Sequence, residues 1–129
     1  TTEIYTLSLH DALPICAMYG AFHKVDNLVA IVDYNKIQLD GFVKDIMELE
    51  PLADKWRGFG WHTIEVDGHD IGALQKAFAE AASTKGKPTV LIAHTIKGKG
   101  VSFMENNPKF HGVAPTAEEV EKALQEIGA

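Results

Sequence analysis

Two polar stretches of the chain carry the residue types that bind a phosphate and its counter-ion. DYNKIQLDG, residues 33–41, presents Asn35, and HTIKGKG, residues 94–100, holds Lys97 and Lys99 among glycines. A carboxamide oxygen and a backbone carbonyl two residues further on suit Mg²⁺, because phosphate and water supply its other ligands. A lysine ammonium acts as a point charge for phosphate, and glycines let the backbone approach it. The same residues also fit an ordinary turn and a solvated loop.

A third stretch, FHGVAP at residues 110–115, places His111 between an aromatic residue and a glycine. A histidine in such a loop can donate a proton or pair with an anion near neutral pH, although most single histidines do neither. The six histidines show no spacing typical of zinc ligands, and no G-x-S-x-G motif is present. The sequence DGHD at residues 67–70 fits a turn and a helix cap better than catalysis.

Apolar runs predict the strands that position these stretches. Leu28–Val32 is an unbroken apolar run, typical of a strand buried on both faces of a parallel sheet. TVLIAHT, residues 89–95, is a second strand of this buried type, and residues 62–67 form a short strand. KIQLDG is expected to be a loop. Strands alternating with helices indicate right-handed crossovers and an α/β fold, a parallel β-sheet flanked by helices.

The helices are predicted from caps and from apolar spacing. A first helix ends within residues 17–27, a second follows Pro51, a third follows the N-cap Asp70, and a fourth opens with a capping box at Thr116. The residues expected to face the core are Leu52, Trp56 and Phe59 in the second helix, Ile71, Leu74, Phe78 and Ala81 or Ala82 in the third, and Val120, Leu124 and Ile127 in the fourth.

Ligands of parallel sheets lie beyond the carboxyl ends of the strands. The segments at those ends are Asp33–Gly41 and Thr95–Pro115. These segments contain the candidate residues Asn35, Lys97 and His111. We therefore expect the chemistry of the protein there.

Three separated blocks resemble transketolase, in particular the N-terminal half that many bacteria and archaea encode separately. They are, in order, LVAIVDYNKIQLDG, EPLADKWRGFGWHTIEVDGHDI and KPTVLIAHTIKGKGVSFMENNPKFHGVAP. The resemblance covers residues 17–129 and implies a truncated thiamine diphosphate-binding fold. It also implies transfer of a two-carbon ketol unit from a ketose phosphate to an aldose phosphate, in the pentose phosphate pathway.

The resemblance assigns a role to each candidate site residue. Asn35, through its side chain, and Ile37, through its carbonyl, would ligate Mg²⁺ (or Ca²⁺). Leu39 would lie against the thiamine diphosphate, and Lys97 would approach it. His111 would face both cofactor and substrate, and it is the catalytic candidate.

Some features of the family are missing from this sequence. The Gly-Asp-Gly that supplies a carboxylate ligand, and several histidines, should precede residue 17, and the glutamate that activates the cofactor belongs to another domain. We therefore expect half a metal site, inactive alone. The expected partner is the C-terminal, pyrimidine-binding half, a separate chain, in a dimer or heterotetramer of the intact enzyme.

The opening TTEIYTLSLHDALPI, residues 1–15, shows no structural period and no signal-peptide pattern. Its codons can be written so that they resemble a common short-read sequencing adapter, with Cys16 at the junction. We expect residues 1–16 to be a non-native leader. Residues 17–129 would then be the C-terminal part of the N-terminal, thiamine diphosphate-binding domain of transketolase, beginning within a helix near Ala17.

Composition limits the class of protein. The net charge of −6 argues against nucleic-acid and anionic-membrane partners, and no apolar run reaches the roughly 18 residues of a spanning helix. A cytoplasmic protein is expected. The alternatives are another thiamine diphosphate enzyme, such as deoxyxylulose-phosphate synthase or a keto-acid dehydrogenase component, and a non-catalytic α/β binding module. HGVAP and DGHD favour transketolase over the other enzymes.

Overall fold

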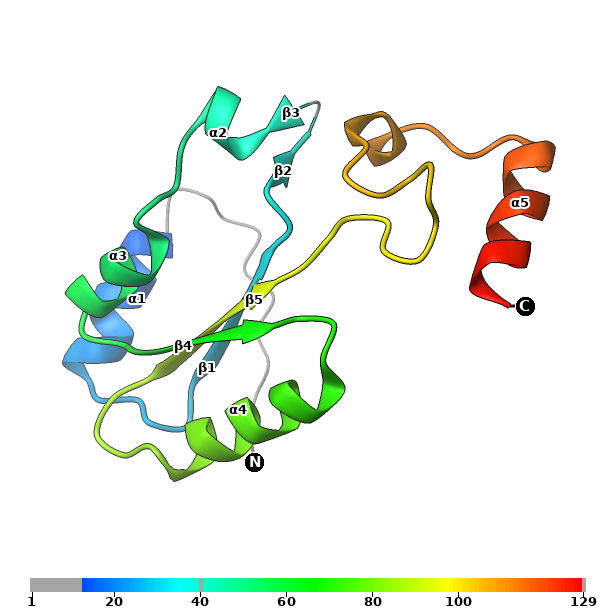
Figure 1. Cartoon of the computed structure of the whole chain (residues 1–129). Helices are drawn as coiled ribbons and strands as arrows, with labels where there is room; N and C mark the ends of the chain where they lie inside the picture. Colours follow the sequence, from blue (N-terminus) through cyan, green and yellow to red (C-terminus); the bar gives the residue numbers. More distant parts are fainter. Residues whose placement is uncertain (1–12, 40, 129) are drawn as a thin grey trace. The chain divides into compact units, whose positions relative to one another are not determined.

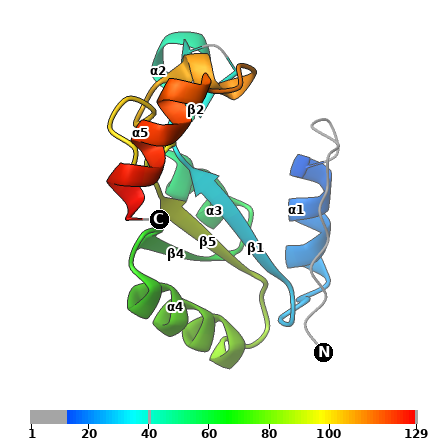
Figure 2. The same ribbon diagram turned by 90° about the vertical axis from the view of Figure 1, so that its right-hand side faces the viewer.

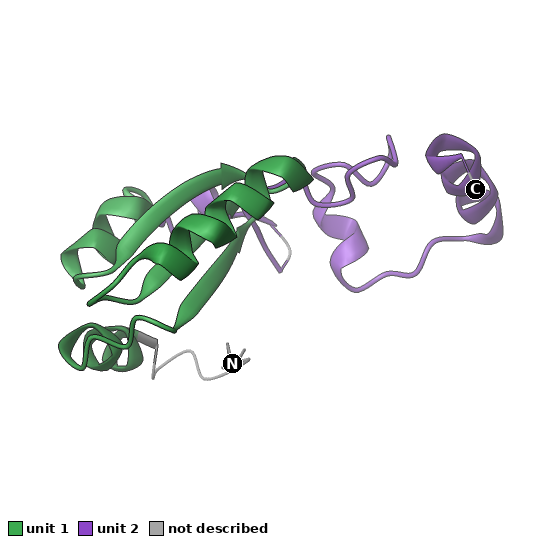
Figure 3. Ribbon diagram, turned by 90° about the horizontal axis from the view of Figure 1, so that it is seen from below, with its two compact units in different colours: residues 1–34, 50–94 green, residues 35–49, 95–129 purple. Residues whose placement is uncertain are grey.

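A computed structural model describes residues 13–39 and 41–128. The chain divides into two compact units, shown in Figure 3. Unit 1 comprises residues 1–34 and 50–94, and unit 2 comprises residues 35–49 and 95–129. The predicted leader lies mostly outside the described residues. Helix α1 (Leu13–Phe22) begins before Ala17, and the leader assignment stays a prediction.

Unit 1 is built on a three-stranded parallel sheet. Its strands β1 (Val29–Tyr34), β4 (His62–Asp67) and β5 (Thr89–His94) lie in the order β1-β5-β4. Both pairs are parallel, and all six residues of β5 are in register with residues of β1 and of β4. Figure 2 shows β5 between its two neighbours. The predicted parallel sheet is therefore confirmed.

The path of the chain explains how helices cover both faces of this sheet. After β1, the chain runs through α3 (Leu52–Gly58) to β4, which lies two strand positions away in the sheet. It then returns through α4 (Ile71–Ser83) to β5, which fills the central position between them. Right-handed crossovers that run in opposite directions place their helices on opposite faces. Figure 1 shows α3 and α4 separated by the strands. Beside α3, α1 accepts a hydrogen bond of 2.8 Å at the Ala17 carbonyl from the indole of Trp61.

The central strand β5 forms the core of unit 1. Thr89 to Ala93 are all buried, as the apolar run predicted. The predicted inward stripe of α4 is partly wrong, because Ile71 is 67% exposed and Phe78 is 44% exposed. Ala81 faces the sheet as predicted, and Ala77 does so too, because their small side chains let the helix backbone approach it closely. The residues that share this cluster are Val66, Leu91, Ala93 and, partly buried, Val29, Ile64, Ala73 and Leu74.

Strand β1 departs from the prediction of burial on both faces. It lies at the edge of the described sheet, and Ile31 is 54% exposed although its register partner Leu91 is fully buried. An edge strand has a neighbour on one side only, so its outer side chains have fewer groups to cover them. An apolar run alone does not distinguish an edge strand from a central one.

Unit 2 contains short elements that the sequence did not predict. Strands β2 (Ile37–Gln38) and β3 (Gly41–Phe42) form an antiparallel hairpin where a loop was expected, and α2 (Val43–Ile46) follows it. A 3₁₀ turn, η1 (Pro108–His111), precedes α5 (Ala117–Ile127). In the part of the chain that the structure describes, no helix has the length and apolarity needed to cross a membrane.

Helix α5 begins as predicted but does not bury its apolar stripe. Its capping box is complete, because Thr116 accepts from the Glu119 amide and Glu119 accepts from the Thr116 amide, at 3.3 and 2.8 Å. The predicted inward residues are all substantially exposed: Val120 at 40%, Leu124 at 44% and Ile127 at 55%. The prediction of an inward stripe is therefore wrong, because polar contacts hold α5 in unit 2.

The capping box predicts an acid-sensitive helix start. Hydrogen bonds from Thr116 lower the pKa of Glu119 below the ordinary carboxyl value. The stabilisation is therefore complete above the ordinary value and is lost as pH falls through the lowered pKa. We expect the Thr116 amide NMR signal to move over that range in the native chain and to stay constant in Glu119→Gln, which keeps the hydrogen bond without titrating. Identical titration of both proteins would contradict this.

Candidate functional site

The two predicted ligand loops start at the same end of the sheet. β1 and β5 are parallel neighbours, and their last residues, Tyr34 and His94, are paired in register. The segments that begin at Asn35 and Thr95 therefore leave adjacent strands at the carboxyl edge. That edge is where parallel sheets hold their ligands.

The loop after β1 is folded around the Asn35 side chain. Its Oδ1 accepts a hydrogen bond of 3.0 Å from the Ile37 amide, and Lys36 between them has a left-handed φ of 64°. The Val43 amide donates to the Lys36 carbonyl at 2.9 Å. Hydrogen-bonded and non-hydrogen-bonded pairs alternate along an antiparallel ladder. Because Lys36 and Val43 are hydrogen-bonded, the next pair, Ile37 and Phe42, is of the non-hydrogen-bonded kind, and the Ile37 carbonyl is directed away from β3. The turn brings the side-chain oxygen of Asn35 and the backbone of Ile37 together, as the predicted ligand pair requires.

Leu39 lies at the tip of the β2–β3 hairpin in an unfavourable backbone conformation. Its φ is 48°, a left-handed value that is uncommon outside glycine, asparagine and aspartate, and its side chain is 59% exposed. Strained backbone of this kind gathers at ligand-binding sites. The geometry fits an apolar side chain held out for a cofactor, and the contact itself stays a prediction.

The loop after β5 is wound into successive tight turns. The Asn106 amide donates to the Lys97 carbonyl at 3.0 Å, and the Val101 amide donates to the Gly98 carbonyl at 3.2 Å. Gly98 has a φ of 75°, and a Cβ added to it would lie 2.5 Å from the Met104 carbonyl oxygen. Glycine is therefore required at position 98, and the turn fixes the backbone from which the Lys97 side chain extends.

The two lysines of this loop have different surroundings. Lys99 is exposed and lies 3.5 Å from the Glu105 carboxylate, whose same oxygen accepts from the Gly100 amide. Lys97 is half-buried, and no carboxylate within residues 13–39 and 41–128 forms an ion pair with its ammonium. Within the described part of the chain, Lys97 is thus the lysine of this loop without a carboxylate partner, and its role toward an anionic ligand stays a prediction.

His111 is the last residue of η1 and is exposed. Asn107 caps this turn by accepting from the Lys109 amide at 3.1 Å, and the adjacent Phe110 packs edge-on against Phe103 at 5.6 Å between ring centroids. This packing ties the His111 segment to the Lys97 loop. The convergence of His111, Asn35 and Lys97 on one ligand stays a prediction.

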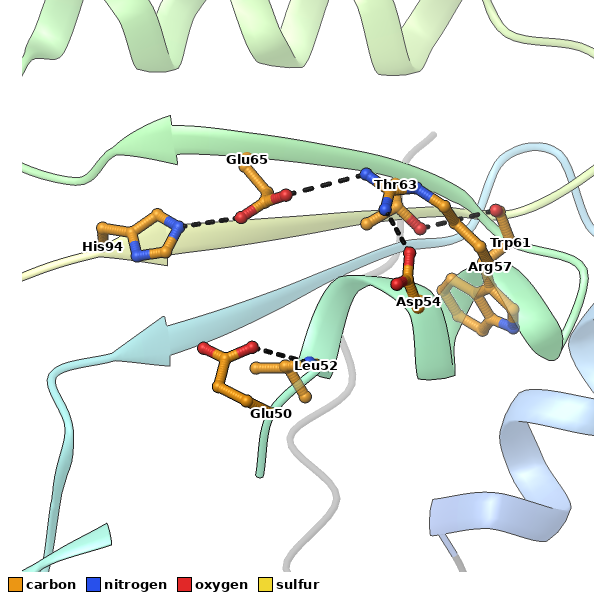
Figure 4. A network of polar contacts seen from close by, with 8 residues as sticks. All are labelled: Glu50, Leu52, Asp54, Arg57, Trp61, Thr63, Glu65 and His94. Atoms are coloured by element: carbon orange, nitrogen blue, oxygen red, sulfur yellow. Dashed lines mark hydrogen bonds and ion pairs between the residues drawn. The ribbon is translucent and has the colours of Figure 1, made fainter. Parts of the chain in front are cut away.

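Sequence reasoning missed a polar network in unit 1, shown in Figure 4. His94 contacts Glu65 at 3.1 Å, and Glu65 lies 3.6 Å from Arg57 of α3. The hydroxyl of Tyr34 donates to Glu50 at 2.7 Å, and the rings of Tyr34 and His94 are 5.6 Å apart. The network fastens the last residues of β1 and β5 to α3. In the sequence, Glu65 between the apolar residues Ile64 and Val66 of a short strand was a signal that could have pointed to it.

The residues present fit Mg²⁺ bridging a diphosphate. The described residues contain no group of three or more His, Cys, Asp or Glu side chains placed to hold a metal. Asn35 and Ile37 offer two oxygens of the hard type that Mg²⁺ prefers, and Mg²⁺ commonly takes one or two protein ligands together with phosphates and waters. Lys97 would supply charge to offset the diphosphate.

The parallel sheet, with the Asn35 and Lys97 loops at its carboxyl edge, defines an α/β domain of the class whose ligands lie at that edge. A family model described as "Transketolase, thiamine diphosphate binding domain" matches residues 12–129. The chain belongs to the transketolase family. It is thus a thiamine diphosphate-binding domain, as the three sequence blocks indicated.

Similar proteins agree with this placement. The chain is 44% identical over 111 residues to one of the subunits of the apulose-4-phosphate transketolase of Phocaeicola vulgatus, covering 86% of this chain and 40% of that protein. It is 42% identical to a 6-deoxy-6-sulfo-D-fructose transketolase subunit of a Clostridium species, with the same coverage. The crystal structure of Campylobacter jejuni transketolase superposes with a TM-score of 0.82 at 29% identity, over 89% of this chain and 18% of that one. The chain thus spans less than half of each relative.

Proposed function

We propose that this chain forms the diphosphate-binding side of a transketolase active site that moves a two-carbon ketol unit from a ketose phosphate to an aldose phosphate. The observation that carries the proposal is the paired end of β1 and β5, from which the Asn35 turn and the Lys97 loop both begin. The named substrates of the relatives differ, so the proposal extends to the reaction class and not to a particular sugar.

Each residue has a defined task in this proposal. Asn35 Oδ1 and the Ile37 carbonyl bind Mg²⁺, and Lys97 offsets the remaining diphosphate charge. Leu39 packs against the cofactor and excludes water. His111 donates a hydrogen bond to the substrate oxygen at which negative charge develops. When bound, thiamine diphosphate supplies the carbanion chemistry, and the protein orients and shields it.

A second chain completes the site in our proposal. Two of the relatives are named as transketolase subunits, which supports a pyrimidine-binding partner chain. The glutamate that activates the cofactor and the carboxylate ligand of the metal would come from outside residues 17–129. We therefore expect weak cofactor binding and no turnover by this chain alone, and its cytoplasmic location stays a prediction.

Paramagnetic NMR tests the metal ligands. Mn²⁺ takes the same oxygen ligands as Mg²⁺ and broadens nearby signals. We expect Mn²⁺ with thiamine diphosphate to broaden the Asn35 side-chain amide and the Ile37 backbone amide, because both lie at the proposed ligand oxygens. Mutating a residue that only supports a metal ligand typically weakens metal binding roughly 10- to 100-fold. Asn35→Ala removes a proposed ligand itself, so it should weaken Mn²⁺–thiamine diphosphate binding by at least this factor.

Asn27→Ala is the matched control, because it removes an exposed asparagine beside the opposite end of β1. It should bind like the native chain. Broadening centred away from the Asn35 turn, or equal binding by Asn35→Ala, would refute the proposed metal site. Tight binding in a calorimetric titration would refute the expectation that the site is incomplete.

A further inference from the structure

Glu126, near the end of α5, holds a residue of the Lys97 loop with both of its carboxylate oxygens. Oε2 accepts from the Ser102 amide, and Oε1 accepts from the Ser102 hydroxyl at 2.8 Å. These hydrogen bonds favour the charged carboxylate and lower the pKa of Glu126. The contact is thus a two-point attachment between residues far apart in the sequence.

Lys122, one helical turn earlier, reinforces this attachment. Its ammonium lies 5.3 Å from the ring centroid of Phe103 and 3.8 Å from the Glu126 carboxylate. Two side chains four positions apart on one helix therefore contact two consecutive loop residues. This geometry fixes both the position and the orientation of the Ser102–Phe103 step.

Ser102 and Phe103 connect to both functional segments of unit 2. On the side of Lys97, two backbone hydrogen bonds hold the loop: the Val101 amide donates to the Gly98 carbonyl, and the Asn106 amide donates to the Lys97 carbonyl. Towards His111, the Phe103 ring packs on Phe110, and the Phe103 carbonyl accepts from the Asn107 side chain at 3.0 Å. A restraint on this one step is therefore transmitted in both directions.

We propose that Glu126 is a positioning residue that, from α5, pre-organises the Lys97 loop and the His111 segment for the cofactor. The inference rests on the proposed roles of Lys97 and His111. A loop held before binding loses less conformational entropy when the ligand arrives, so its affinity is higher. This role also explains why α5 is retained in unit 2 although its apolar stripe is exposed.

The test compares Glu126→Ala with Glu121→Ala in the full chain. Glu121 is an exposed residue of the same helix, so the two variants share the change in helix propensity. We expect Glu126→Ala to speed amide exchange at Asn106, whose amide bonds to Lys97, while amides at the start of α5 keep their exchange rates. It should also weaken the Mg²⁺–thiamine diphosphate response at Lys97 by about tenfold, the lower end for a supporting residue.

Further variants separate positioning from simple stability. Glu126→Gln keeps an acceptor of the same shape and should restore most of the binding, and Ser102→Ala should reproduce a smaller part of the loss. If the native chain binds and Glu126→Ala binds equally well, the positioning role is wrong and the proposed function stands. If the native chain shows no Mg²⁺-dependent response at Asn35 or Lys97, both proposals are wrong.

Discussion

Gly98→Ala is expected to disrupt the turn that carries Lys97. A Cβ at this position would lie 2.5 Å from the carbonyl oxygen and 2.7 Å from the carbonyl carbon of Met104, and backbone atoms cannot rotate away as a flexible side chain can. The left-handed φ of 75° adds a cost of about 1–2 kcal/mol, and the forced contact adds about 1–3 kcal/mol. The expected destabilisation is therefore about 2–5 kcal/mol.

Gly128→Ala provides the control for this prediction. Gly128 also belongs to unit 2 and has a φ of 73°, but nothing lies within 4 Å of its added Cβ. It should lose only the conformational term, about 1–2 kcal/mol. Urea denaturation followed by NMR signals of unit 2 measures both losses, and the cofactor response at Lys97 should fall in Gly98→Ala alone. Equal losses in the two variants would show that the contact with Met104 is not limiting.

Leu91→Ala is expected to destabilise unit 1 by about 2–5 kcal/mol, because it leaves a cavity in the core. Leu91 is fully buried in the central strand and packs in the cluster formed with Val66, Ala77 and Ala81. The side chains of the surrounding alanines are too short to fill the space. The Lys97 loop begins at the end of β5. Unfolding of β5 in Leu91→Ala should therefore also abolish the metal-dependent changes in the NMR signals of this loop.

Ile31→Ala is the matched control for Leu91→Ala. The two residues are register partners on adjacent strands, but Ile31 is 54% exposed at the sheet edge. Its truncation should cost about 1 kcal/mol, the span of strand preferences measured in host proteins. The midpoint of urea unfolding, followed by tryptophan fluorescence, distinguishes the two variants. Similar losses would show that β1 is packed as tightly as β5.

Local signals in the sequence predicted much of the fold. The strand at residues 62–67, the N-cap at Asp70 and the capping box at Thr116 all occur as expected. Each depends on residues close together in the chain: an apolar run, a side-chain acceptor beside the first helical turn, or a reciprocal pair three positions apart. Such signals do not need the tertiary structure to act.

The hairpin after β1 escaped prediction for a physical reason. Two-residue strands are too short to show a period, and its left-handed positions are occupied by Lys36 and Leu39 rather than by glycine. The sequence nevertheless singled out Asn35, because a carboxamide oxygen suits a hard cation, and that ligand role stays a prediction. The sequence thus indicated which residue to examine before its conformation was known.

Only the tertiary structure distinguished between residues of the same kind. Residue type and local spacing do not separate Lys97 from Lys99; the family resemblance selected Lys97, and in the structure Lys99 is the one paired with Glu105. The strand order β1-β5-β4 likewise decided that Leu91 is buried and Ile31 is not. Residue types and local spacing determined the longer helices and strands, the family blocks and the candidate ligands of this protein. The burial of side chains, the pairing of Lys99 with Glu105 and the hydrogen bonds from Ser102 to Glu126 depend on contacts in the folded chain, which local spacing does not encode.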